Sequence, residues 1–175
     1  LIGDDMKSQF GASILSQVLQ ELAIKRGHHV KCHIQRNIGG NTDFLNMTDI
    51  NRVTSKKISK ENVIRSHSDD DTFVHAGPSE YISYHKDNKI ANIHMELEGF
   101  MGSPVVLNAE LSVIDSPNSA GVVIDAIRYL KIAKDLGMKG SIRGPSAFTQ
   151  KTPPLQMTLD ESIRECDRLS DLGSK

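Results

Sequence analysis

Lysines at a short, regular spacing are the first residues of this 175-residue chain that could do chemistry. Lys56 and Lys60 are four residues apart in the segment SKKISK, so on a helix their Cβ atoms would lie about 5–6 Å apart on one face. Two ammonium groups at that spacing repel each other unless an anion lies between them, and a phosphate ester carries close to two negative charges at neutral pH. A phosphate site and a solvated basic surface both fit this pattern. Lys89 and Lys151, taken singly, carry no such signal.

Acidic residues stand where elements are expected to begin or end. Asp5 follows a strand-like start and precedes a helix with Ser8 at its head, Asp43 follows a Gly-Gly turn, and Asp115 lies between a strand and a helix. Strand-end acids are frequent active-site positions in α/β proteins. An acid before a helix is also ordinary capping, so both interpretations stay open.

Several other kinds of site are absent from the sequence. The seven histidines form no pair at metal-ligand spacing, and there is no GxGxxG, GxSxG or phosphate-binding P-loop. The chain therefore contains no complete dinucleotide-binding fingerprint, and any anion site must depend on local lysines.

The composition is that of an ordinary globular domain, with 38% hydrophobic and 25% charged residues. A net charge of −1 argues against nucleic acid or an anionic membrane as a partner. There is no signal peptide and no apolar run near the roughly 20 residues of a membrane span, so we expect a cytoplasmic location, with Cys32 and Cys166 as reduced thiols. The start LIGDD reads like the end of a buried strand, which suggests a fragment of a longer protein.

The first half of the chain alternates between helical and extended patterns. Residues 8–26 predict a helix with one apolar stripe, and residues 30–34 predict a half-buried strand. A tight turn is expected at 37–41, followed by a short helix capped by Thr42. The stripe consists of Phe10, Ile14, Val18 and Leu22, and the strand alternates through Val30, Cys32 and Ile34.

Strands are predicted in the middle of the chain. After a turn at HAGPS (75–79), strands are expected at 81–85, 90–98 and 105–114, and the short connection 99–104 favours an antiparallel hairpin. One face of the second strand holds Ala91, Ile93, Met95 and Leu97, and one face of the third holds Val105, Leu107, Ala109, Leu111 and Val113.

Helices are predicted after the strands. Ser116 is expected to cap a long helix that buries Val123, Ile127 and Leu130 and ends at Gly137. Residues 144–154 read as loop, and 160–172 as an amphipathic helix using Ile163, Cys166 and Leu169. This order predicts an α+β fold with a mostly antiparallel sheet and helices on one face.

Seven segments, in one order along the chain, resemble myo-inositol-1-phosphate synthases of the shorter bacterial and archaeal type. They are GDDMKSQFGASI from Gly3, NIGGNTDFLNM from Asn37, SKKISK from Ser55, HAGPSEY from His75, DNKIANIHMELEG from Asp87, DSPNSAGVVIDAIR from Asp115 and PSAFTQKTPP from Pro145. In that family an inserted catalytic and tetramerisation domain splits a Rossmann-like NAD domain. The resemblance implies that 1–8 end the Rossmann-like part, that 9–114 form the inserted domain, and that 115–175 are the helical return.

The resemblance also implies a reaction. Family members oxidise C5 of glucose 6-phosphate with NAD, form an enolate, close the ring by an intramolecular aldol step and reduce the product to inositol phosphate, as an early step of inositol and phospholipid biosynthesis. Lysines suit such chemistry because they stabilise alkoxides and transfer protons. The family's catalytic positions fall on Lys56, Lys60, Lys89, Lys151 and Asp115. We expect Lys56 and Lys151 near C5, Lys60 and Lys89 at the phosphate and alkoxides, and Asp115 paired with Lys56.

The family's cofactor-side positions form a second set, and some members also use a divalent metal. Asp5, Asp43 or Asp115 could hold such an ion through oxygen ligands.

Lys86 and Ile90 depart from the family's usual glycine and aromatic residue. A homotetramer is implied for the whole protein, and these residues alone are not expected to turn over. The alternative is a non-catalytic module that binds phosphate and oligomerises. The cofactor-side positions are Asp5, Ser8, Asn41, Asp43, Asp87 and Ser116.

Overall fold

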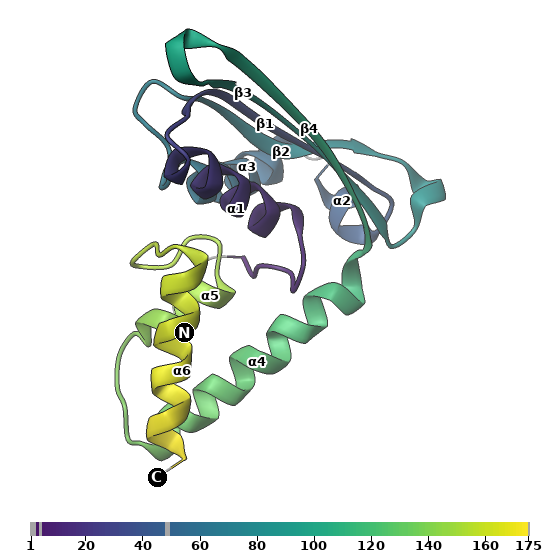
Figure 1. Cartoon of the computed structure of the whole chain (residues 1–175). Coiled ribbons are helices and arrows are strands. Elements are labelled where there is room, and N and C mark those ends of the chain that lie inside the picture. The colour runs from purple at the N-terminus through teal and green to yellow at the C-terminus, as the bar shows by residue number, and fades with distance from the viewer. Residues whose placement is uncertain (1–2, 4, 48–49, 175) are drawn as a thin grey trace.

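A four-stranded sheet with helices against one face forms the upper part of the molecule (Figure 1). The computed structural model describes residues 3, 5–47 and 50–174, without the side chains of 50–56. The strand order is β2-β1-β3-β4. The strands are β1 (His29–Gly39), β2 (Phe73–Tyr81), β3 (Asn88–Glu98) and β4 (Pro104–Ile114). The helices are α1 (Ala12–Lys25), α2 (Thr42–Asn46), α3 (Ile50–Arg65), α4 (Asp115–Asp135), α5 (Arg143–Thr149) and α6 (Leu159–Gly173), with short 3₁₀ turns at Ser83–His85 and Phe100–Gly102.

The sheet is mixed rather than antiparallel throughout. β3 pairs antiparallel with both β1 and β4, which confirms the predicted hairpin, whereas β2 pairs parallel with β1. The predicted turn at 75–79 is wrong, because these residues belong to β2, and the strand predicted at 81–85 is largely a 3₁₀ turn. β2 is an edge strand with a register shift opposite Pro78, the two situations in which a sheet tolerates proline. The prediction of an α+β fold is confirmed.

The core beneath β3 agrees with the predicted face, since Ala91, Ile93, Met95 and Leu97 are all buried. On β1 the prediction is wrong: the buried side chains beyond Val30 are His33, Gln35 and Asn37 rather than Cys32 and Ile34. The register shifts between Val30 and Cys32. Because side chains alternate along a strand, an irregularity of one residue exchanges the two faces.

The apolar stripe of α1 does not face the sheet. Phe10 is 58% exposed and lines, with Val18 and with Phe148 of α5, an apolar groove of about 350 Å³. Leu22 is 54% exposed and borders a second apolar hollow beside Leu107 of β4. The helix starts at Ala12 rather than Ser8, because the Asn118 side chain bonds both backbone polar groups of Phe10 and holds it outside the helix. Leu15 and Leu19, both partly buried, pack against the apolar cluster of the sheet. The fully buried residues of α1 are mainly small or polar, and they are Ala12, Ser13, Ser16, Gln17, Gln20, Glu21 and Ala23.

The long helix α4 leads away from the sheet toward α5 and α6 (Figure 1). Gly137, at φ +67°, follows its end as predicted, but the buried side was assigned incorrectly, since Ile127 is 60% exposed. The first turn of α4 contacts the segment before α1 through Asn118 and Ser119, and one row farther along is covered by α5 and α6. That row comprises Val122, Ala126 and Ala133.

Two further sequence predictions concern the helix ends of this region. Ser116 is not a cap, because Ile114 occupies the N-cap position and the helix includes Asp115. The segment predicted as loop contains α5, and the last helix is confirmed as α6, with Cys166 and Leu169 buried and Ile163 partly exposed.

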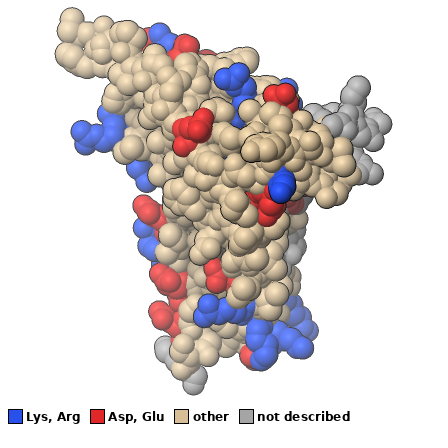
Figure 2. Space-filling view, turned by 90° about the vertical axis from the view of Figure 1, so that its right-hand side faces the viewer, with Lys and Arg blue, Asp and Glu red and all other residues tan. Residues whose placement is uncertain are grey.

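The surface shows no dominant charge. Lysine, arginine and acidic side chains are intermixed on the face shown in Figure 2. Within the part of the chain that the structure describes, no helix has the length and apolar character needed to cross a bilayer.

His33 is a fully buried histidine that makes the fold sensitive to acid. Its Nδ1 donates to Gln20 Oε1 at 2.9 Å, and burial lowers its pKa to about 4. Because the unfolded chain binds the proton more tightly, stability that is present above pH 6.5 is lost as the pH falls toward 4, by about 3 kcal/mol in total. We expect His33→Gln to remove most of this slope in urea unfolding between pH 7.5 and 4.5. His85→Gln is the control that keeps the slope, and an unchanged slope in His33→Gln would contradict the assignment.

Lys86 adopts φ +51° and ψ −121°, a region that L-residues other than glycine rarely occupy. Such a residue stores about 1 kcal/mol or more of strain. We therefore expect Lys86→Gly to stabilise the protein by about 1 kcal/mol, net of the added freedom of the unfolded chain. Thermal unfolding measures the gain, and Lys86→Ala, which keeps the Cβ atom, should show none. Equal stability of the glycine and alanine variants would exclude strain at this position.

Candidate active site

The candidate site begins as a row of three side chains at one end of the sheet. β1 pairs with β3 so that Gly39 faces Lys89, and β3 pairs with β4 so that Asn88 faces Ile114. Continuing both registers past the strand ends brings Asn41, Asp87 and Asp115 together. The amide of Asp115 donates to the carbonyl of Asp87 at 2.9 Å, which extends the ladder to this point.

Asn41 connects the row to α2. Its Oδ1 accepts from the backbone amides of Asp43 and Phe44, while its Nδ2 donates to Asp87 at 3.3 Å and to Asp115 at 3.4 Å. Two glycines precede it because the chain passes very close to its neighbour: a Cβ atom at Gly40 would lie 2.3 Å from the carbonyl oxygen of Ile82.

Asp87 is held ionised by the row. Partial burial would raise its pKa, but hydrogen bonds from the Ser116 hydroxyl (2.8 Å) and Asn41, the Ser116 amide and the charge of Lys89 lower the pKa below its usual value. Ser116 therefore bonds Asp87 instead of capping its own helix.

Two lysines of the site are paired with carboxylates. Lys89 Nζ forms a short ion pair with Asp115 Oδ1, and both side chains are largely shielded from solvent. Lys151 Nζ lies 2.6 Å from Asp5 Oδ2. The second pair joins residues 146 positions apart, because Met6 bridges Gln150 and the amide of Lys151 donates to the carbonyl of Asp5.

Both ion pairs open into one small pocket of about 80 Å³, continued by a space of about 20 Å³. Lys60 comes from α3, lines both spaces and is 9% exposed. Lys56 lies on the same helix, but its side chain lies outside the described residues, so its expected pairing with Asp115 is untested. The walls of the larger space include Asp5, Ser8, Asp43, Phe44, Lys60, Lys89, Asp115, Ser119 and Lys151.

The structure thus brings most of the sequence-derived site residues together, at different depths. Asp5, Ser8 and Asp43 border the pocket, whereas Asn41 and Asp87 belong to the adjoining row and Ser116 bonds to that row through Asp87. Ser8 Oγ lies 3.4 Å from Ser119 Oγ of α4. Among the described residues, the lysine that Asp115 pairs with is Lys89, which the sequence had placed at the phosphate and alkoxides.

Sequence reasoning missed four residues around the pocket. Ser119 lies on its wall, Gln35 and Asn37 line its deeper part, and Lys7 is buried behind Lys151. Gln35 donates to Asn37, which donates to the carbonyl of Gly77. The signal available in the sequence was polar residues at alternate positions of one strand, which are unusual when that face is buried.

A separate group of possible metal ligands lies at the other end of β1. His29 is 3.3 Å from both Asp69 and Asp71, and the three are largely at the surface. The rise from His29 to Gly39 along β1 is ten residue steps, or about 30 Å, so this group has no part in the pocket.

Comparison with known proteins gives one consistent result. The family model described as myo-inositol-1-phosphate synthase matches residues 11–116. The inositol-3-phosphate synthases of Corynebacterium glutamicum and Mycolicibacterium smegmatis are 44% and 42% identical over 94% and 95% of the chain, which covers 47% and 48% of those proteins. The crystal structure of a myo-inositol-1-phosphate synthase-related protein from Thermotoga maritima superposes with a TM-score of 0.86 at 28% identity, over 97% of this chain and 45% of that one.

The chain therefore spans about half the length of these relatives. The matched region contains α1–α3 and the whole sheet, together with the start of α4 where Asp115 pairs with Lys89. On this evidence the chain belongs to the myo-inositol-1-phosphate synthase family.

Proposed function

We propose that the protein carrying this chain converts glucose 6-phosphate to inositol phosphate through NAD-dependent oxidation, enolisation, intramolecular aldol closure and reduction. The observation that carries the proposal is the convergence of Lys60, Lys89 and Lys151, from three separate segments, on one polar pocket. The relatives named inositol-3-phosphate synthase support the same assignment.

The charge arrangement suits a phosphorylated sugar. Three ammonium groups around one space repel each other, and the carboxylates of Asp5 and Asp115 offset two of them. The carboxylate of Asp43 also borders this space. The oxygens of a phosphate accept charge-assisted hydrogen bonds from lysine, so a phosphorylated sugar meets several such donors in one place. A basic patch for general anion binding has no need of the buried, paired arrangement seen here.

We assign the binding and alkoxide-stabilising roles to Lys60 and Lys89, and proton transfer near C5 to Lys151 together with Lys56. Preorganised cations at atoms where negative charge develops stabilise a transition state strongly, because they do not reorient during the reaction. Asp115 fixes the direction of the Lys89 ammonium group through its ion pair. Asp5 does the same for Lys151 and can accept a share of its proton at Oδ2.

The adjoining row, together with the neighbouring Asp43 and Ser116, fits part of a dinucleotide. Asn41, Asp43, Asp87 and Ser116 offer carboxylate, amide and hydroxyl groups, which match ribose hydroxyls and a carboxamide. Anionic side chains suit the pyrophosphate poorly, so we assign only the nicotinamide-ribose side to this row. The chemistry that NAD supplies when bound is the acceptance and return of a hydride.

The residues fit a divalent metal less well. Asp5 and Asp115 border the pocket, but each is already engaged by a lysine, and a cation there would compete with an ammonium group. We derive no step through a metal. Since the chain covers about half of its relatives, activity and the expected homotetramer are proposed for the whole protein, and light scattering on the purified gene product tests the assembly.

Lys89→Met in the full-length gene product should lower the rate of inositol phosphate formation from glucose 6-phosphate and NAD by about 10²–10⁴-fold, since it removes a preorganised cation. Lys134→Met, which changes an exposed lysine of α4, is the matched control and should keep full activity. If both variants are as active as the wild type, Lys89 has no catalytic role. If the wild type forms no product with NAD, even with zinc, magnesium or ammonium added in turn, the protein is instead a phosphate-binding module.

Lys60→Met should weaken binding of glucose 6-phosphate by about 10–100-fold, because loss of one charge-assisted contact costs about 1.5–3 kcal/mol. Titration calorimetry on the same gene product measures the dissociation constant, with Lys134→Met again as control. An unchanged dissociation constant would remove Lys60 from the phosphate site, whether or not the enzyme is active.

A further inference from the structure

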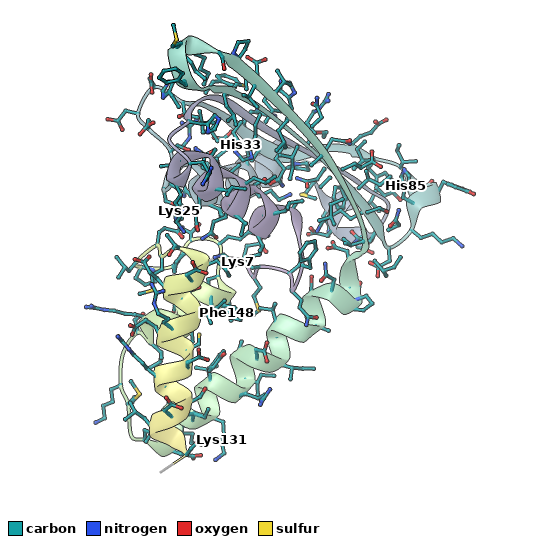
Figure 3. All side chains as sticks on the ribbon, viewed as in Figure 1. Lys7, Lys25, His33, His85, Lys131 and Phe148 are labelled. Atoms are coloured by element: carbon teal, nitrogen blue, oxygen red, sulfur yellow. The ribbon has the colours of Figure 1, made fainter. Side chains whose placement is uncertain are left out.

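Lys7 is a buried lysine that the proposed reaction leaves without a role. Its side chain is 2% exposed and lies between α1 and α5, below the sheet (Figure 3). Burial lowers its pKa to about 8; the charge of Glu21 opposes this effect and the nearby Lys151 adds to it. Lys7 therefore lies close to a lysine of the site but does not line the pocket.

The position of Lys7 is explained by the way α5 ends. The amide of Gln150 donates to the carbonyl of Ser146, as in a continuing helix, but the next amide, that of Lys151, donates to Asp5 instead. The carbonyl of Ala147 thereby loses the amide partner that an α-helix would supply four residues later. Lys7 Nζ donates to this carbonyl at 2.7 Å, with a weaker contact to Gln17 Oε1 at 3.4 Å.

Main-chain contacts also hold together the two segments that carry the Asp5–Lys151 ion pair. The amide of Lys7 donates to the carbonyl of Thr149 at 2.8 Å, and Met6 bridges Gln150. Asp5 and Lys151 follow directly on either side of this short ladder. The side chain of Lys7 stabilises the end of α5 from its buried side, and the short ladder directs Lys151 toward the pocket.

We propose that Lys7 is a positioning residue for Lys151, whose buried ammonium group replaces the missing helical amide at the end of α5 and so sets the Asp5–Lys151 pair in the site. The catalytic consequence rests on the proposed function, but the positioning itself does not.

A space-filling role alone does not account for a lysine here. A methionine of similar length would fill the same volume without the desolvation of an ammonium group. The cation does match its surroundings, because carbonyls at the C-terminal end of a helix favour positive charge. The lysine costs some stability, and it keeps a fixed donor at the carbonyl of Ala147, one helical turn before Lys151.

A kinetic double-mutant cycle in the full-length gene product tests the proposal. Lys7→Met should lower kcat for glucose 6-phosphate by about 100-fold, the scale of a misplaced catalytic group, with little change in KM. Combined with Lys151→Met it should lower kcat no further than Lys151→Met alone, because Lys7 acts through Lys151. If the effects of Lys7→Met and Lys151→Met on kcat multiply, the proposal is overturned and Lys7 has only a general structural role. Lys25→Met, at the exposed end of α1, is the control.

A second measurement does not require activity. Trace acetylation with acetic anhydride, read for each lysine by mass spectrometry, should show Lys151 several-fold more reactive in Lys7→Met than in the wild type, with Lys134 unchanged. Lys7→Gln, which keeps a donor for Ala147 but no charge, should lie between the two and serves if Lys7→Met does not fold. If Lys151 is labelled equally in Lys7→Met and in the wild type, the positioning role is overturned. If Lys151 is labelled more in Lys7→Met but the wild type makes no inositol phosphate, only the proposed function is overturned.

Discussion

The antiparallel register of β3 against its two neighbours is the constraint on which the site depends. With Gly39 opposite Lys89 and Asn88 opposite Ile114, three residues far apart in sequence meet at one end of the sheet. A slip of one residue would turn Asp87 or Asp115 to the other face, because side chains alternate along a strand. The register in turn depends on the packed face of β3, whose four apolar side chains are buried, three of them in one cluster with Ala23 of α1.

Electrostatic compensation is the second constraint, and it operates at short range. Lys89 and Lys151 each form an ion pair with a neighbouring carboxylate, and Lys60 reaches the same space from α3. Ion pairs shielded from water are useful only when their geometry is fixed, since desolvation otherwise exceeds the attraction. The fixing comes from main-chain contacts: the end of the β3–β4 ladder for Asp115, and the short bridge between Met6 and Gln150 for Asp5 and Lys151.

Buried polar groups, rather than a continuous apolar core, join α1 to the sheet near the site. Ser16 donates to Gln35, and Gln20 accepts from His33. Each such bond satisfies a group that would be costly to leave unpaired inside the protein. Because polar side chains make these buried contacts, the apolar stripe through Phe10 and Leu22 predicts the wrong face of α1 as the buried one.

The sequence by itself determined the elements whose patterns are local, together with the family resemblance. The hairpin of β3 and β4, the end of α4 at Gly137 and the amphipathic helix α6 follow from alternation, glycine and apolar periodicity, which act over a few positions. The motifs also named the lysines and acids that the described residues bring together, apart from Lys56. Only the tertiary structure decided which faces are buried, that β2 runs parallel to β1, and that Asp115 meets Lys89. It also introduced Lys7, since the carbonyl that this lysine satisfies becomes available only when α5 ends against a segment 140 residues away.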